Sequence, residues 1–145
     1  MLAIEYPSVN FKTKQQGNQQ LIFDEFRKKW VVLTPEEWVR QHFLYYLVQV
    51  KDYPAALIAV EKEIRLGELK KRCDIVVYKG QKPWMIIECK EQDTALNEQV
   101  IAQILRYNIT LAVEYLVITN GNYSRAFYIA NSPATAEIDS LPDWL

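Results

Sequence analysis

The chain has 145 residues, of which 50% are hydrophobic and 24% charged, and this is the composition of a globular protein that folds as one domain. Seventeen Lys and Arg residues against eighteen Asp and Glu residues leave a net charge of −1, which excludes a strongly basic nucleic-acid coat but allows a local basic patch. One histidine and two cysteines exclude a multi-histidine zinc site and a disulfide scaffold.

Turn and capping residues mark the elements of the first third of the chain. Polar alternation around Gly17-Asn18 predicts a hairpin over residues 11–23, and residues 26–33 are expected to form a connection. The run Thr34-Pro35-Glu36-Glu37 is typical of a helix start, with a capping threonine, a proline at the first position and the acid of a capping box. The helix should end near residue 50 and bury its apolar side chains, Trp38, Phe43, Tyr46, Leu47 and Val50.

Apolar runs predict three strands in the middle of the chain, over residues 56–64, 74–78 and 84–89. Residues 79–83 carry the turn between the last two. The strands over 74–78 and 84–89 each contain an unbroken apolar run in place of alternating apolar and polar residues. We therefore expect the sheet to be covered on both faces.

A second helix is predicted from about Thr94 to Ala112, followed by strands over 115–119 and 125–129. Residues 131–145 form a polar tail that Trp144 would anchor. The order of hairpin, helix, three strands, helix and two strands predicts an α/β fold, with one mixed sheet flanked by helices in a single domain (1–145) whose core spans about residues 23–130. Neither a signal peptide nor a membrane-spanning stretch is expected, which indicates a cytoplasmic protein.

The predicted hairpin over residues 74–90 carries the candidate chemistry. If its turn is centred on Gln81, Asp74 lies opposite Glu88, with the two side chains on one face and the Cβ atoms ~4.5–5.5 Å apart. Lys90 would point to the same side of the sheet. Facing carboxylates repel unless a cation lies between them, and an oxygen donor set suits Mg²⁺ or Mn²⁺ better than zinc.

Asp74 and Glu88-Cys89-Lys90 resemble the active site of PD-(D/E)xK nucleases, and Gln103 to Tyr107 fits the Gln-x-x-x-Tyr motif that follows it in some of them. The stretch from Phe23 to Tyr128 resembles the N-terminal domain of type I restriction enzyme R subunits. Two features depart from this pattern: Cys73 stands where proline is common, and the chain carries no helicase motor.

The resemblance implies a restriction-endonuclease-like fold, a Mg²⁺-dependent DNA endonuclease and a role for each motif residue. Asp74, Glu88 and the carbonyl of Cys89 would be metal ligands, with Glu37 as an accessory acid. Lys90 would act on the water and the phosphate, while Gln103 and Tyr107 would line the DNA side. The implied partners are DNA and either a second copy of the chain or a motor subunit on another chain.

Several alternatives stay open from the sequence. The chain could be a non-catalytic DNA-binding or assembly module, its substrate could be RNA, and its cleavage could be endo- or exonucleolytic. Glu37 needs no role beyond capping, and Tyr107 could belong to the core. The two cysteines are expected to be buried, reduced neighbours on the face opposite the carboxylates. Among the charge runs, Lys70, Lys71 and Arg72 are the preferred phosphate contacts, because they lead directly into Asp74.

Overall fold

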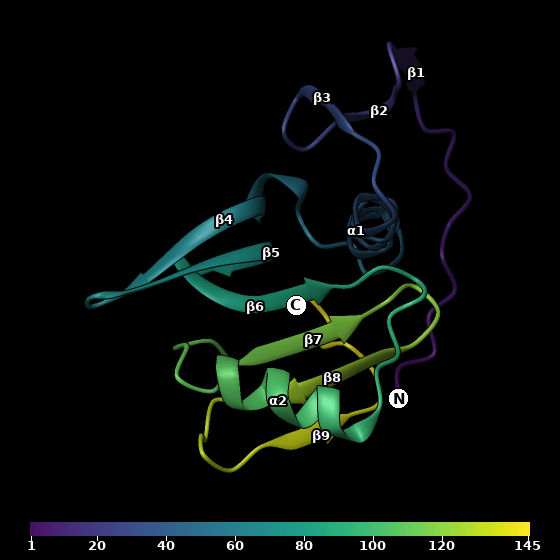
Figure 1. The fold of residues 1–145 in the computed structure, drawn as a ribbon. Helices are drawn as coiled ribbons and strands as arrows, with labels where there is room; N and C mark the ends of the chain where they lie inside the picture. The colour runs from purple at the N-terminus through teal and green to yellow at the C-terminus, as the bar shows by residue number, and fades with distance from the viewer.

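The computed structural model describes residues 1–145, apart from the side chain of Leu66. It contains a three-stranded and a six-stranded sheet with a long helix on each side of the larger one (Figure 1). The smaller sheet comprises β1 (Thr13–Gln16), β2 (Gln19–Asp24) and β3 (Lys29–Val32). The larger comprises β4 (Ile58–Leu66), β5 (Leu69–Lys79), β6 (Lys82–Cys89), β7 (Tyr115–Thr119), β8 (Ser124–Tyr128) and β9 (Ala136–Ile138). The predicted mixed α/β fold is confirmed.

The N-terminal hairpin forms around Gly17-Asn18 as expected, but the segment after it is not a simple connection. Residues 29–32 return as β3 and pair antiparallel with β2, with Phe23 opposite Trp30. The reversal depends on Asp24, whose side chain accepts hydrogen bonds from the backbone N–H groups of Phe26 (2.7 Å) and Arg27 (3.0 Å). An Asp side chain that accepts hydrogen bonds from the backbone N–H groups just after it stabilises a turn.

The first helix, α1 (Pro35–Tyr45), begins where the capping residues predict, with the Thr34 hydroxyl accepting a hydrogen bond from Glu37 N at 3.0 Å. It continues as a π-helical turn, η1 (Tyr46–Val50). Two side chains expected in the core are exposed: Trp38 at 36% and Val50 at 48%. The Trp38 ring packs against His42 and Phe11, with ring centroids 4.3 and 5.4 Å apart, and its remaining surface is open to solvent.

The six strands run in sequence order across the sheet, and all neighbours are antiparallel except β6 and β7. A parallel pair needs a crossover, which α2 (Glu98–Asn108) supplies. Helix α2 begins later than predicted because Asn97 caps it, accepting a hydrogen bond from Val100 N at 2.9 Å, and it ends at Asn108, before the predicted Ala112. Strand β5 begins five residues before the predicted position, and a 3₁₀ turn, η2 (Ala55–Leu57), precedes β4.

The register of the β5–β6 hairpin agrees with the prediction near the candidate site, since Ile75 pairs with Ile87 and Val77 with Met85. The turn itself contains two residues, Gly80 and Gln81, both with positive φ. A β-bulge after Val77 shifts the register by one residue and so compensates for the shorter turn.

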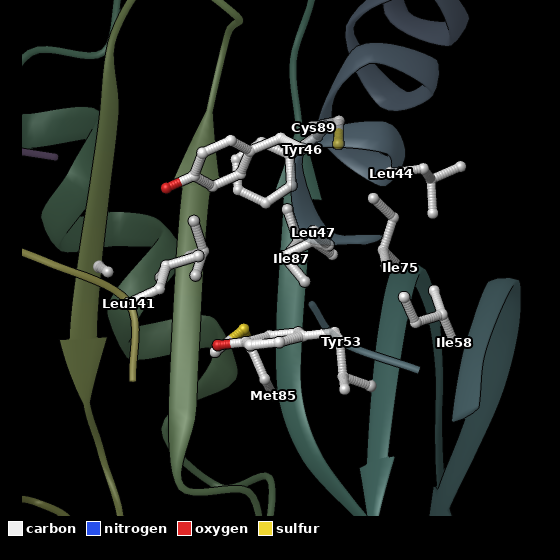
Figure 2. Close-up of a cluster of buried hydrophobic side chains, with 14 of the residues drawn as sticks. Leu44, Tyr46, Leu47, Tyr53, Ile58, Ile75, Met85, Ile87, Cys89 and Leu141 are labelled. Atoms are coloured by element: carbon white, nitrogen blue, oxygen red, sulfur yellow. The ribbon is translucent and has the colours of Figure 1, made fainter. Parts of the chain in front are cut away.

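Each face of the larger sheet has its own core, which confirms that these strands are covered on both sides. Helix α1 and the turn η1 pack Leu44 and Leu47 against Ile75 and Ile87 on one face (Figure 2). On the other face, α2 packs Ile101 against a second cluster. The tail is anchored as expected, with the Trp144 ring 5.6 Å from Tyr53, although its strand β9 was not predicted. Among the described residues no helix is long and apolar enough to cross a membrane.

Candidate active site

Asp74 lies where the alternation of β5 is broken. Cys73 packs in the core on the α2 side and Ile75 in the core on the α1 side, so the strand changes face between them. On the neighbouring strand, Glu61 has a φ of 50°, and no ladder pair joins it to Asp74. This irregularity turns the Asp74 carboxylate towards α1.

The Asp74 carboxylate is held by two donors. One oxygen accepts a hydrogen bond from Cys89 N at 2.8 Å, and the other accepts one from the Arg40 guanidinium at 3.1 Å. Burial raises the pKa of Asp74 to about 6, against the effects of these two donors, and the charge of Glu88 adds to the rise. Asp74 is therefore a carboxylate whose negative charge is incompletely compensated.

The β5–β6 ladder ends at the Ile75–Ile87 pair, one residue short of Asp74 and Glu88, and the contacts of Glu88 are on the α2 side of the sheet. A single oxygen of Glu88 accepts hydrogen bonds from Lys71 Nζ at 2.9 Å and from Asn108 Nδ2 at 3.1 Å. The Lys71 ammonium lies 3.8 Å from the ring centroid of Tyr107. The prediction that both carboxylates share one face is thus wrong in this structure, because the strand changes face at Asp74.

Residues of the Glu-x-Lys and Gln-x-x-x-Tyr motifs line one cleft. A cavity of about 510 Å³ is lined by Glu88 and Lys90 from the end of β6 and by Gln103, Tyr107 and Asn108 from α2. Tyr107 is 70% exposed, so the alternative that placed it in the core is wrong. Asp74 does not line this cavity. Its carboxylate lies on the α1 side, where it contacts Arg40.

Glu37 has partners that differ from those of an accessory metal ligand. Its carboxylate accepts hydrogen bonds from the guanidinium groups of Arg27 (2.8 Å) and Arg40 (2.9 Å) and from the amide of Gln41 (3.1 Å). Burial opposes ionisation, but these donors outweigh it and hold the pKa of Glu37 below its usual value. The side chain therefore anchors Arg40, which in turn holds Asp74.

The basic run before Asp74 does not form one patch. Lys71 is buried beside Glu88, whereas Lys70 and Arg72 are exposed and alternate with it along β5. Arg72 is paired with Glu61 at 3.1 Å. Cys73 and Cys89 are both free and buried as expected, but they lie in different cores and are not neighbours.

Sequence reasoning assigned no role to two residues that contact the candidate carboxylates, Arg40 and Asn108, and it assigned Lys71 to phosphate and not to Glu88. Arg40 follows Glu37 by three residues, which is a helical ion-pair spacing and a usable signal. Asn108 directly follows the Gln-x-x-x-Tyr motif, and nothing else in the sequence marks it. Its Oδ1 atom is buried without a hydrogen-bond partner.

The donor set of Asp74, Glu88 and a backbone carbonyl has the oxygen chemistry that Mg²⁺ or Mn²⁺ requires. No group of three or more His, Cys, Asp or Glu side chains gathers around a common point in the described part of the chain. Instead, each carboxylate has a cationic partner, Arg40 for Asp74 and Lys71 for Glu88. These residues can hold a divalent ion if the ion replaces Lys71 and Arg40 as the positive charge next to the two carboxylates.

Comparison with known proteins gives one family. The family model described as type I restriction enzyme R protein N terminus matches residues 35–142. No curated protein and no solved structure shows a significant match to the chain.

Proposed function

Because the chain belongs to the family of type I restriction enzyme R protein N-terminal domains, we propose that it is a metal-dependent nuclease that hydrolyses phosphodiester bonds of DNA, with a site of the PD-(D/E)xK type. The observation that carries this proposal is the cleft between β6 and α2. Glu88 and Lys90 line it together with Gln103 and Tyr107, so two motifs that are separate in the sequence share one cavity.

In this proposal Asp74, Glu88 and the carbonyl of Cys89 would hold a divalent ion, Mg²⁺ or Mn²⁺, which when bound supplies Lewis-acid stabilisation of charge on the phosphate. Lys90 keeps its proton on Nζ, donates hydrogen bonds to a phosphate oxygen and orients the attacking water. Gln103 and Tyr107 bind the DNA backbone along the α2 side of the cleft. A second copy of the chain, or a motor subunit on another chain, would bring duplex DNA to this cleft.

The second candidate is a non-catalytic DNA-binding or assembly module. The favouring observation is that both carboxylates already have cationic partners, Arg40 at 3.1 Å and Lys71 at 2.9 Å. In a non-catalytic module, these two cations would hold the carboxylates in place and offset part of their charge without a metal.

A cleavage assay separates the two candidates. The full chain is incubated with linear, circular and single-stranded DNA, and with RNA, in Mg²⁺ or Mn²⁺. Lys90→Ala should slow cleavage by about 10²–10³-fold, because it removes one charge-stabilising donor. The matched control is Lys82→Ala, which removes an exposed lysine from the other end of β6 and should leave the rate unchanged.

Cleavage of the circle would identify an endonuclease. Equal rates for Lys90→Ala and Lys82→Ala would refute the assigned role of Lys90. A wild-type protein that binds DNA but never cleaves it, alone or with a motor subunit, would establish the non-catalytic module.

A further inference from the structure

The three-stranded sheet lies outside the part of the chain that the family model matches. Strands β1–β3 span residues 13–32, whereas the family match begins at residue 35. In Figure 1 this sheet lies beyond α1, apart from β4–β9. It is held on α1 by aromatic contacts such as Phe26 with Tyr45, with centroids 5.7 Å apart, and by the Arg27–Glu37 ion pair. The proposed cleavage chemistry uses none of its residues.

One face of this sheet combines aromatic rings with lysines. The register places Phe23 opposite Trp30, and the two rings pack edge to face at 5.4 Å. Lys14 Nζ lies 4.3 Å from the Trp30 ring centroid, and Lys12 Nζ lies 5.8 Å from that of Phe23. Trp30 is 36% exposed and both lysines are exposed. We refer to Lys12, Lys14, Phe23 and Trp30 as the Lys–Trp face.

The charge of this segment differs from that of the rest of the chain. Residues 11–32 contain five Lys and Arg against two Asp and Glu, a net charge of +3 in a chain whose total is −1. Asp24 is buried against Arg27, and Glu25 is within ion-pair distance of Lys28. Within the described structure neither Lys12 nor Lys14 forms an ion pair, so both ammonium groups are available to an anionic partner.

We propose that the Lys–Trp face binds single-stranded nucleic acid, with Trp30 stacking on a base and Lys12 and Lys14 contacting the flanking phosphates. Only an unpaired strand exposes the faces of its bases to a side-chain ring. On binding, Lys12 and Lys14 move from the aromatic rings to the phosphates. The rings that they covered can then stack on a base. The choice of ligand rests on the proposed function, because this face would give the nuclease a second contact with its substrate.

The test measures the affinity of the full chain for a fluorescent oligo(dT) and for a duplex of equal length, as a function of salt. Trp30→Leu should weaken oligo(dT) binding by about tenfold, because base–aromatic stacking contributes about 1–3 kcal/mol per base. The matched control is Trp38→Leu, since Trp38 is also 36% exposed but lies on α1 outside the Lys–Trp face. Trp30→Phe retains an aromatic ring and should restore most of the affinity.

The lysines are tested by the salt slope. The double substitution Lys12→Ala/Lys14→Ala should reduce the slope of log affinity against log salt by about 1.4, at about 0.7 per phosphate contact on a single strand. Lys62→Ala/Lys82→Ala removes two exposed lysines from the larger sheet and is the control. Thermal melting of each variant shows whether it is folded.

The proposal is overturned if the Trp30 and Trp38 variants bind equally well, if the two double mutants have the same salt slope, or if duplex binding exceeds oligo(dT) binding and does not depend on Trp30. These outcomes are distinct from a failure of the proposed function. If the wild-type protein cleaves DNA but Trp30→Leu binds oligo(dT) as tightly as the wild type, the proposed function stands and the proposal for the Lys–Trp face fails. If the protein never cleaves but its binding depends on Trp30, only the proposal for the Lys–Trp face stands.

Discussion

Lys71 occupies a position on Glu88 that a divalent cation would also require. Its ammonium is 2.9 Å from the carboxylate, is 3.8 Å from the Tyr107 ring centroid, and belongs to a side chain that is buried. An ammonium and a metal ion that share one carboxylate compete, because each repels the other at short range in a medium that screens charge poorly. If the proposed metal site is correct, Lys71 must leave Glu88 when the ion binds.

Replacement of Lys71 by methionine should therefore tighten Mn²⁺ binding by at least about tenfold, since one repelling unit charge is removed from a partly buried site. Calorimetry gives the affinity, and the rise in melting temperature on adding Mn²⁺ should also be larger in Lys71→Met than in wild type. Lys70→Met is the matched control, because Lys70 is adjacent but exposed. Equal affinities in the two variants would mean that Lys71 does not compete with the metal.

At the scale of elements, the strands marked by an apolar run or by a turn signal were predictable, whereas β3 and β9 were not. The apolar centres of β5 and β6 are identifiable because Ile75–Val77 and Met85–Ile87 are buried on both faces, which requires unbroken apolar runs. Strands β3 and β9 have four and three residues, too few for any periodicity, and they form because β2 and β8 present open edges beside them.

The candidate site, like the strands, could be predicted only in part from the sequence. Its motif residues follow from the sequence because two strands and one helix carry them in a fixed order. The face that Asp74 adopts depends on the irregular backbone at Glu61, which lies on another strand and has no signature in the sequence. The cationic partners Arg40 and Lys71 come from long-range contacts, which local spacing does not encode.

An ion pair links strand β9 to its neighbour β8, and this allows a prediction about stability. Glu137 accepts hydrogen bonds from Arg125 on β8 at 2.6 and 2.9 Å, and these bonds lower the pKa of Glu137 to about 2. A carboxyl whose pKa is lower in the folded state stabilises the fold above its unfolded pKa, near 4.5, and loses that contribution as the pH falls towards 2.

Glu137→Gln should accordingly reduce the free energy of unfolding by about 0.5–1 kcal/mol at pH 7, a value kept small because water reaches the Glu137 side chain, which is 32% exposed. Urea unfolding at pH 7 and at pH 2.5 measures the difference between the two proteins, which should shrink at the lower pH. A difference that stays constant with pH would show that Glu137 acts through packing and not through its charge.

At the scale of the whole molecule, a chain of buried ion pairs joins the N-terminal sheet to the candidate site. It runs from Asp24 through Arg27 to Glu37, and from Glu37 through Arg40 to Asp74. Asp24 is fully buried, while Glu37 and Arg40 are 3% and 5% exposed. Removing one partner of a buried ion pair leaves an uncompensated buried charge, so the loss of Arg27 would leave Asp24 without a cation and Glu37 with Arg40 alone.

Arg27 is the arginine of this ion-pair chain that does not contact Asp74, so its removal tests the connection without altering the cleft. Arg27→Met should reduce the free energy of unfolding by about 3–5 kcal/mol, because Asp24 stays fully buried without its cationic partner, while Glu37 keeps only Arg40. Arg72→Met also removes an arginine paired with a carboxylate, but that side chain is 67% exposed, and it should cost less than about 1 kcal/mol. Denaturant titration compares the two variants, and limited proteolysis should cut residues 13–32 faster in Arg27→Met. If the two variants unfold at the same denaturant concentration, the sheet is held on α1 by its aromatic contacts alone, and the ion-pair chain contributes nothing to joining it to the site.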